Sequence, residues 1–196
     1  MPKQPNPELP GLLMDAALQL LDERGDVTFS MRELAGRIGY SVTAVYRCYE
    51  TRGHLLRQLI LKLFEQLSYE LIDPEGGTPL EMVGQVGERF LQWAVTHPGR
   101  FRLMFQHIEA NVLLNPDEQL LARAGLKYLE HLLQEAVDRG ELIHAQPEAL
   151  AIVLFTSLYG LAALAIANRM EGTPGEDVVA FFRAHRDHWL GNRVKE

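Results

Sequence analysis

The sequence predicts an all-α protein of nine helices in two domains, and three observations support this prediction. Apolar residues recur at the three- and four-residue spacing of a buried helical stripe in nearly every segment between turns. Serine, threonine and proline repeatedly stand where helix caps and first helical residues are expected. No alternating run rich in valine, isoleucine and threonine lies between hairpin turns, so no sheet is expected.

The first two helices are predicted from an apolar stripe and from their end signals. The stripe over residues 12–21 is followed by Gly25, whose left-handed conformation would end the first helix. Ser30 followed by Glu33 reads as a capping box that starts a second, short helix, and Gly39 is expected to end it.

The third and fourth helices follow directly. Ser41 is expected to cap a third helix over residues 42–48, and Thr51 a fourth that continues to about residue 72. The segment "DPEGGTP" at residues 73–79 then holds two prolines and two glycines between periodic runs, which marks a boundary.

Five more helices are predicted after this boundary, each from a cap, a proline or a glycine at its ends. Thr78, Pro79 and Glu81 supply a cap, a first-turn proline and an acidic residue for the fifth helix. We expect the five helices over residues 78–96, 101–112, 115–140, 147–170 and 173–191.

Composition places the chain among ordinary soluble proteins. It has 196 residues, 47% hydrophobic and 23% charged, and a single cysteine, Cys48, which excludes an internal disulfide framework and a zinc cage made of cysteines. The start "MPKQPNPELP" has no apolar segment behind a basic end, so we expect no secretory signal and a cytoplasmic protein.

Positive charge is concentrated in one segment of an acidic chain. The net charge is −7, yet residues 27–62 carry six arginines and lysines against only two glutamates. Overall charge argues against a polyanionic partner, but its distribution allows one at this segment.

This basic segment has the pattern of a helix-turn-helix. On a helical wheel, Val42, Thr43, Tyr46 and Arg47 share one side of the third helix, and the opposite side packs. A short second helix with an outward polar face fits the DNA major groove, although the same shape also occurs as an ordinary packing corner. The predicted DNA-binding residues are Thr28, Ser30, Arg32, Ser41, Val42, Thr43, Tyr46, Arg47 and Arg52.

The expected contacts differ in kind. Thr28 and Ser30 lie where backbone N–H groups favour a phosphate, and Arg47 can make a bidentate contact with guanine or with a phosphate. Val42 or Thr43 can touch a thymine methyl group. The hydroxyl of Tyr46 is expected at a backbone oxygen.

Residues 12–56 resemble the N-terminal domain of the TetR family of transcriptional repressors. The matching segments are "DAALQLLDERG" and "TFSMRELAGRIGYSVTAVYRCYETRGHLL". The resemblance implies that Tyr46 and Arg52 clamp phosphates and that Ser41, Val42, Thr43 and Arg47 face the operator. Ala44 departs from a threonine that is frequent in the family, Cys48 from a histidine and Arg52 from a lysine.

The second half resembles the regulatory half of one TetR branch. The segments concerned are "FLQWAVTHPGRFRLMFQ" and "RGELIHAQPEALAIVLFTSLYGLAAL". The resemblance implies a small-molecule effector and a homodimer formed by the last two helices. The expected organisation is a three-helix DNA-binding domain at residues 1–52 and a helical ligand-binding and dimerisation domain at residues 53–196.

Residues 149–167 carry no charge and are long enough to cross a membrane. Small residues in this run and the lack of a basic flank favour a buried helix, and no membrane partner is expected. A small domain cannot cover such a helix on all sides, so a second subunit is its expected partner.

Aromatic and other large residues in the second half are candidates to line an effector pocket between helices, and any of them can equally be plain core. His185 and His188 are spaced to hold a metal, but a solvated helix face is favoured, and neither a metal nor a cofactor is expected. The predicted ligand-binding residues are Phe90, Trp93, Phe101, Met104, Phe105, His107, Phe155 and Tyr159.

We therefore expect a dimeric regulator, most simply a repressor, that binds a palindromic operator in double-stranded DNA and is released by a small apolar or amphipathic effector. An enzyme is not expected, because the chain has no glycine-rich phosphate loop, zinc-binding H-E-x-x-H motif or nucleophile elbow. The alternative is a helical adaptor that binds proteins and not DNA.

Overall fold

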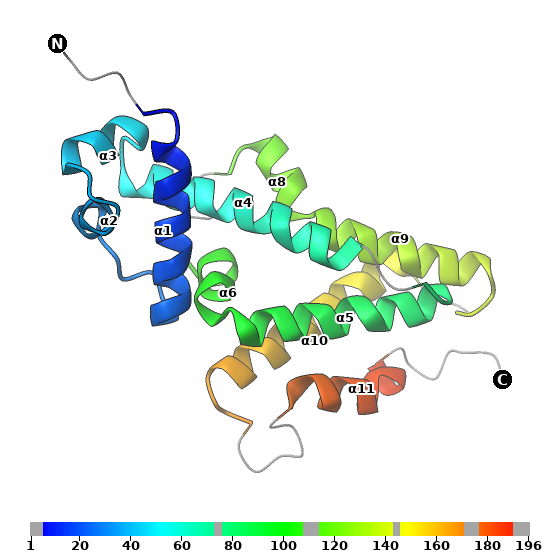
Figure 1. Cartoon of the computed structure of the whole chain (residues 1–196). Helices are drawn as coiled ribbons and strands as arrows, with labels where there is room; N and C mark the ends of the chain where they lie inside the picture. Colours follow the sequence, from blue (N-terminus) through cyan, green and yellow to red (C-terminus); the bar gives the residue numbers. More distant parts are fainter. Residues whose placement is uncertain (1–5, 73–75, 108–113, 143–145, 171–176, 190–196) are drawn as a thin grey trace. The chain divides into compact units, whose positions relative to one another are not determined.

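The computed structural model describes residues 6–72, 76–107, 114–142, 146–170 and 177–189, and this part of the chain is helical without a strand (Figure 1). The all-α prediction is confirmed. The described helices are α1 (Leu9–Arg24), α2 (Met31–Arg37), α3 (Val42–Cys48), α4 (Arg52–Ile72), α5 (Pro79–Thr96), α6 (Pro98–Phe105), α8 (Pro116–Ala122), α9 (Ala124–Asp138), α10 (Pro147–Ile166) and α11 (Val178–Trp189).

Helix ends follow the predicted cap chemistry. The Ser30 and Ser41 hydroxyl oxygens accept hydrogen bonds from the backbone N–H groups of Glu33 and Ala44, each at 3.2 Å. Thr78 with Glu81 forms both bonds of a capping box, at 3.3 and 2.8 Å. The box predicted at Ser30 is only half formed, because the Glu33 carboxylate binds Arg24 on α1 instead.

The helix count is one point at which the prediction is wrong. The described residues form ten helices rather than nine, because the single helix expected over residues 115–140 is broken at Arg123. The Arg123 N–H donates to the Leu120 carbonyl at 3.1 Å, a tight turn, and Gly125 weakens the first turn of α9. In addition, α6 ends at Phe105, and the predicted extension to residue 112 lies mostly outside the described residues.

Contacts divide the chain into two compact units, which we call unit 1 (residues 1–64 and 97–119) and unit 2 (residues 65–96 and 120–196). In unit 1, α1 packs against α2, α3 and α6. Its core holds large apolar side chains from α1, α2, α4 and the loop before α2 that are at most 2% exposed, and these are Leu13, Leu20, Leu21, Phe29, Leu34, Leu55, Leu56, Leu59 and Ile60.

Helix α6 approaches α1 closely within unit 1. Gly99 lies against the Leu21 carbonyl, and a Cβ atom at residue 99 would overlap that oxygen. Arg100 pairs with Asp22 through two bonds of 2.8 and 2.5 Å. Arg102 donates to the carbonyl of Gly25, which ends α1 with a φ of +68°. The end of α1 is therefore fixed from two directions, by α6 and by α2.

Unit 2 is a bundle in which α5, α9, α10 and α11 pack together. Phe90 on α5 and Phe155 on α10 meet edge to face, with ring centroids 5.9 Å apart. Gly87 gives room to the ring of Phe182 on α11, since a Cβ there would lie 2.6 Å from a ring carbon. The sequence predicted that the DNA-binding domain ends at residue 52. The packing units do not test this boundary, because α4 contributes residues to both of them.

By length and composition alone, α10 is long and apolar enough to cross a membrane. The core helix of a soluble protein can meet the same criteria. Only 22% of the most apolar 18-residue stretch of this helix is buried within the chain. Ile152 and Val153 are 55% and 56% exposed, and Leu164 is 44% exposed. Within the part of the chain that the structure describes, an apolar face of this helix is thus exposed.

Candidate nucleic-acid interface

Helices α2 and α3 form a compact pair joined by a glycine turn. Gly39 has a φ of +72°, and the Tyr40 N–H returns to the Ala35 carbonyl at 2.9 Å. On α3, Val45 is fully buried and anchors the helix on the core. The pair has the form that a helix-turn-helix requires.

The outward face of α3 carries most of the side chains that the sequence predicts there. Thr43 and Arg47 are exposed, and Tyr46 is 47% exposed, which is unusual for a large aromatic residue. Ser41 is exposed at the cap, and Val42 is half-buried. These five residues therefore belong to α3 and its N-cap, and all but Val42 are exposed.

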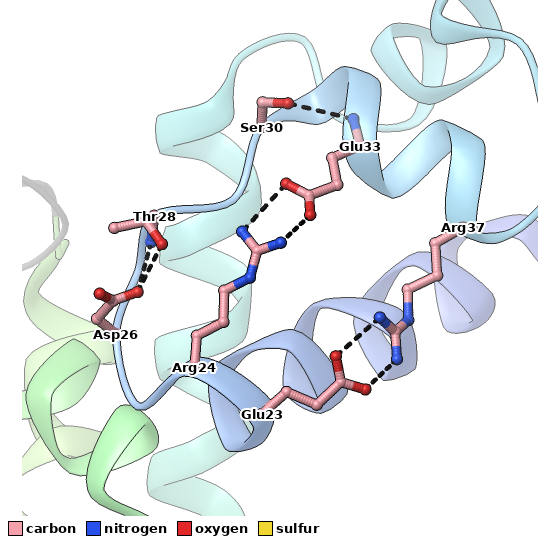
Figure 2. Close-up of polar contacts among 7 residues, drawn as sticks. All are labelled: Glu23, Arg24, Asp26, Thr28, Ser30, Glu33 and Arg37. Carbon is pink, nitrogen blue, oxygen red and sulfur yellow. Dashed lines mark hydrogen bonds and ion pairs between the residues drawn. The ribbon is translucent and has the colours of Figure 1, made fainter.

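Two ion pairs hold α2 on α1, as Figure 2 shows. Arg37 donates to both carboxylate oxygens of Glu23, one at 2.9 Å. Arg24 donates to both oxygens of Glu33, one at 3.2 Å. The hydrogen bonds that Arg37 donates to the Glu23 carboxylate lower the pKa of Glu23 and raise the pKa of Arg37. Because the four side chains are partly exposed, these pairs orient α2 more than they stabilise the unit.

Thr28 and Ser30 precede α2 in one short loop (Figure 2). The N–H and the hydroxyl of Thr28 both donate to one oxygen of Asp26, at 3.2 and 2.6 Å, and the hydroxyl bond lowers the pKa of that carboxyl. Thr28 must therefore give up Asp26 before it can donate to a phosphate. The Ser30 oxygen caps α2 as an acceptor, so its hydroxyl hydrogen remains available.

Most of the cations counted in the basic segment have partners inside the molecule. Within the described residues, four of the six are engaged: Arg37 by Glu23, Arg57 by Glu118, Lys62 by Asp15 at 3.3 Å and Arg52 by carbonyl groups. Arg32 on α2 and Arg47 on α3 are exposed and have neither an ion pair nor a hydrogen bond in that part of the chain. These two are the cations of the segment that are best placed for a polyanion.

Arg52 differs from its predicted setting. Its Nε donates to the Phe29 carbonyl at 3.2 Å and its Nη2 to the Val27 carbonyl. The guanidinium carbon lies 5.8 Å from the centre of the Phe29 ring. The side chain is half-buried, and two of its donors point at the loop before α2.

The predicted ligand-binding residues fall into both units. Phe90, Trp93, Phe155 and Tyr159 belong to unit 2, and the other four belong to unit 1. Phe90 and Trp93 are buried, as are Phe101 and Met104, whereas the remaining four are half-buried. Within the units, Phe90 meets Phe155, and the rings of Phe101 and Phe105 lie 5.2 Å apart.

The described histidines outside this set form no metal site: His54 and His97 are half-buried, and His131 and His185 are exposed. The side chain of His131 is 65% exposed and lies 3.9 Å from Glu135. The ring of His185 stacks on Phe181 with a centroid distance of 4.4 Å. The side chain of His188 lies outside the described residues.

Two family models cover most of the chain. Residues 13–59 match the family of bacterial regulatory proteins named tetR, and residues 83–188 match the tetracyclin repressor-like C-terminal domain. The chain is also 26% identical over 183 residues to the HTH-type transcriptional repressor KstR of Rhodococcus jostii (strain RHA1). That match covers 93% of this chain and 69% of the repressor.

Solved structures share the fold. A TetR-family transcriptional regulator from Pectobacterium atrosepticum has a TM-score of 0.73 at 21% identity, with 96% of this chain and 95% of that chain covered. The fatty acid degradation regulator FadR from Bacillus halodurans has a TM-score of 0.75 at 14% identity, with 98% and 100% covered. A protein of unknown function from Rhodococcus sp. RHA1 has a TM-score of 0.81 at 20% identity over the full length of both chains.

These matches decide between the alternatives that the sequence left open. An adaptor without DNA binding would not be expected to match a family of bacterial regulators over the helix-turn-helix itself, at residues 13–59. The chain belongs to the TetR family of transcriptional regulators, with a DNA-binding N-terminal domain and a ligand-binding C-terminal domain.

Proposed function

We propose that this regulator is a repressor that binds a palindromic operator as a homodimer and leaves it when a small effector binds. The observation that carries the DNA part is the exposure of Arg47 on α3 and of Arg32 on α2, because these are the cations of the basic segment without a partner among the described residues. Cations free of internal carboxylates release counterions from DNA when they contact phosphates.

The proposed division of roles follows the chemistry of each side chain. Arg47 contacts a guanine edge or a phosphate, and Tyr46 donates its hydroxyl to a phosphate. Val42 and Thr43 face the bases, and Ser41, Ser30, Thr28 and Arg32 contribute to the sugar-phosphate contacts. Arg52 donates two hydrogen bonds to backbone carbonyl groups of the protein, so its role differs from that of the residues proposed to contact DNA directly.

We propose that α10 and α11 form the dimer interface. The apolar face of α10 that includes Ile152, Val153 and Leu164 supports this, since covering it would remove a large apolar area from water. A two-fold dimer would place two α3 helices at half-sites about 34–36 Å apart on one side of the duplex.

The proposed effector is small and apolar or amphipathic. Support comes from the aromatic side chains of unit 2, where Phe90, Trp93, Phe155 and Tyr159 would offer an apolar surface. Phe101, Met104, Phe105 and His107 belong to unit 1 and stay candidates for effector contact within that unit. Effector binding would favour a conformation in which the two α3 helices no longer match the half-sites. As a DNA-binding regulator, the protein is proposed to work in the cytoplasm.

Selection of bound fragments from the genome of the source organism tests this proposal. We expect a fragment with an inverted repeat, protected on one side of the duplex, and a protein that sediments as a dimer. A recovered site without two-fold symmetry, or a protein that is monomeric on the DNA, would contradict the dimeric arrangement.

A further inference from the structure

Arg52 opens α4, yet its guanidinium is directed back along the chain toward the loop before α2. It donates to the carbonyls of Phe29 and Val27, which are 23 and 25 residues earlier. Within the described residues, no backbone N–H outside the regular helices donates to either carbonyl. The arginine therefore supplies hydrogen bonds that this loop does not make with its own backbone.

The contact also fixes the orientation of the loop. Phe29 is 2% exposed and serves as the core anchor of the loop, and the guanidinium lies 5.8 Å from its ring centre. On the outer side, Thr28 is tied to Asp26 through its N–H and its hydroxyl. The loop is thus held from α4 by Arg52 and internally by Asp26.

The chemistry of this contact is specific to arginine. A planar guanidinium can donate to two carbonyls at once from nitrogens in a fixed geometry, whereas a lysine ammonium is a compact point charge. The location is unfavourable for a cation on helical grounds alone, because the N-terminal end of a helix carries partial positive charge. Stability of α4 therefore does not explain an arginine at its first residue.

We infer that Arg52 is a positioning residue for DNA binding: it holds the loop that presents Thr28 and Ser30, and it does not itself clamp a phosphate. The inference rests on the proposed function of the α2 and α3 face. It departs from the role that the family resemblance implies for this residue, because the Nε and one Nη2 hydrogen of the guanidinium are directed at the Phe29 and Val27 carbonyls, which fixes the group on the loop.

Two substitutions separate positioning from direct contact. Arg52→Lys keeps the charge and loses the two-carbonyl geometry, whereas Arg52→Met keeps much of the stem and loses both. For positioning, both variants weaken binding to a mixed-sequence duplex of about 30 base pairs by about tenfold, and neither changes the slope of log Kobs against log salt. For a direct phosphate clamp, Arg52→Lys binds like the wild type and Arg52→Met lowers the slope by about one per subunit.

Arg32 provides the matched comparison for a direct contact. It is exposed on α2 and has no partner in the described part of the chain, so Arg32→Met should lower the slope by about one per subunit. All titrations are performed at a temperature well below the thermal unfolding midpoint of each variant. This midpoint is measured in parallel, so that lost binding does not reflect unfolded protein. Wild-type affinity for Arg52→Lys overturns the inference.

A second measurement needs no DNA. In the free protein, backbone amide order parameters of residues 27–30 should fall from about 0.85 toward 0.6 in both Arg52 variants and stay unchanged in Arg32→Met. Unchanged order parameters in Arg52→Lys and Arg52→Met would overturn the inference. If the wild type fails to bind duplex, the proposed function fails, whereas this measurement still decides whether Arg52 holds the loop.

Discussion

Arg37 in the last turn of α2 binds both carboxylate oxygens of Glu23 in the last turn of α1, with one bond of 2.9 Å (Figure 2). The pair connects a helix of the DNA-binding face to the helix that packs on α2, α3 and α6. Because α2 has only seven residues, such contacts determine its orientation more than its own hydrogen bonds do.

The Glu23→Gln substitution should lower the urea midpoint of unfolding at pH 7. The pKa of Glu23 is lowered in the folded protein from its ordinary value of 4.5, mainly by the Arg37 hydrogen bond. A carboxyl of this kind contributes stability that is fully present above its unfolded pKa and is lost as the pH falls through its folded pKa. The difference between variant and wild type should therefore begin to shrink as the pH falls below about 4.5 and vanish below the lowered pKa of the folded state, as pH-dependent urea titrations can show.

Glu50→Gln is the matched control for this prediction. Glu50 is exposed in the same unit and makes no ion pair within the described residues. Its substitution should leave the midpoint nearly unchanged at both pH values. Equal effects of the two substitutions at pH 7 would show that the Glu23–Arg37 pair does not stabilise the fold.

Gly99→Ala should destabilise the protein by about 2 kcal/mol, because the new Cβ overlaps the Leu21 carbonyl oxygen and pushes α6 away from α1. Gly36→Ala in α2 should act in the opposite direction. Nothing lies within 4 Å of a Cβ at residue 36, so alanine gains about 0.5–1 kcal/mol from helix propensity. Denaturant unfolding of both variants tests the packing, and two variants of equal stability would argue against the close approach of α6.

The caps and apolar stripes could be predicted from the sequence because they are local. Ser30, Ser41 and Thr78 each cap a helix three residues before their partner N–H. The break at Arg123 was missed since neither a proline nor a positive-φ glycine marks it, and the apolar pattern continues across it. The all-helical class and the helix starts that carry a serine or threonine cap were therefore predictable, whereas the start of α6 at Pro98 and this interruption were not.

The candidate site was predictable only in part, because sequence counts do not show which charges pair. Arg57 binds Glu118, 61 residues away, and Arg52 binds carbonyls of a loop that precedes two helices. The excess positive charge at residues 27–62 indicated the right segment, whereas the distinction between paired cations and Arg32 or Arg47 required the fold. One sequence signal pointed to the ion pairs between α1 and α2. Glu23 stands in the last turn of α1, where a negative charge is unfavourable unless a cation pairs with it.

Gln66→Met should raise stability by about 1 kcal/mol. The Gln66 Oε1 on α4 is buried without a hydrogen-bond partner in the described structure, which costs desolvation energy that methionine avoids at similar volume. Gln58→Met on the same helix carries no such buried atom and should change stability by less than about 0.5 kcal/mol. Thermal unfolding checks both, and a loss of stability in Gln66→Met would show that its amide is hydrogen-bonded in solution.

The salt dependence of duplex binding tests the central claim, which is that Arg32 and Arg47 are the cations that this regulator offers to DNA. The slope of log Kobs against log salt is measured for the wild type, Arg32→Ala, Arg47→Ala and Arg57→Met. The first two variants should each lower the slope by about one per subunit, and Arg57→Met should not, because Arg57 is paired with Glu118. Equal slopes in all four proteins, or a wild type that does not bind duplex at low salt, would contradict the account.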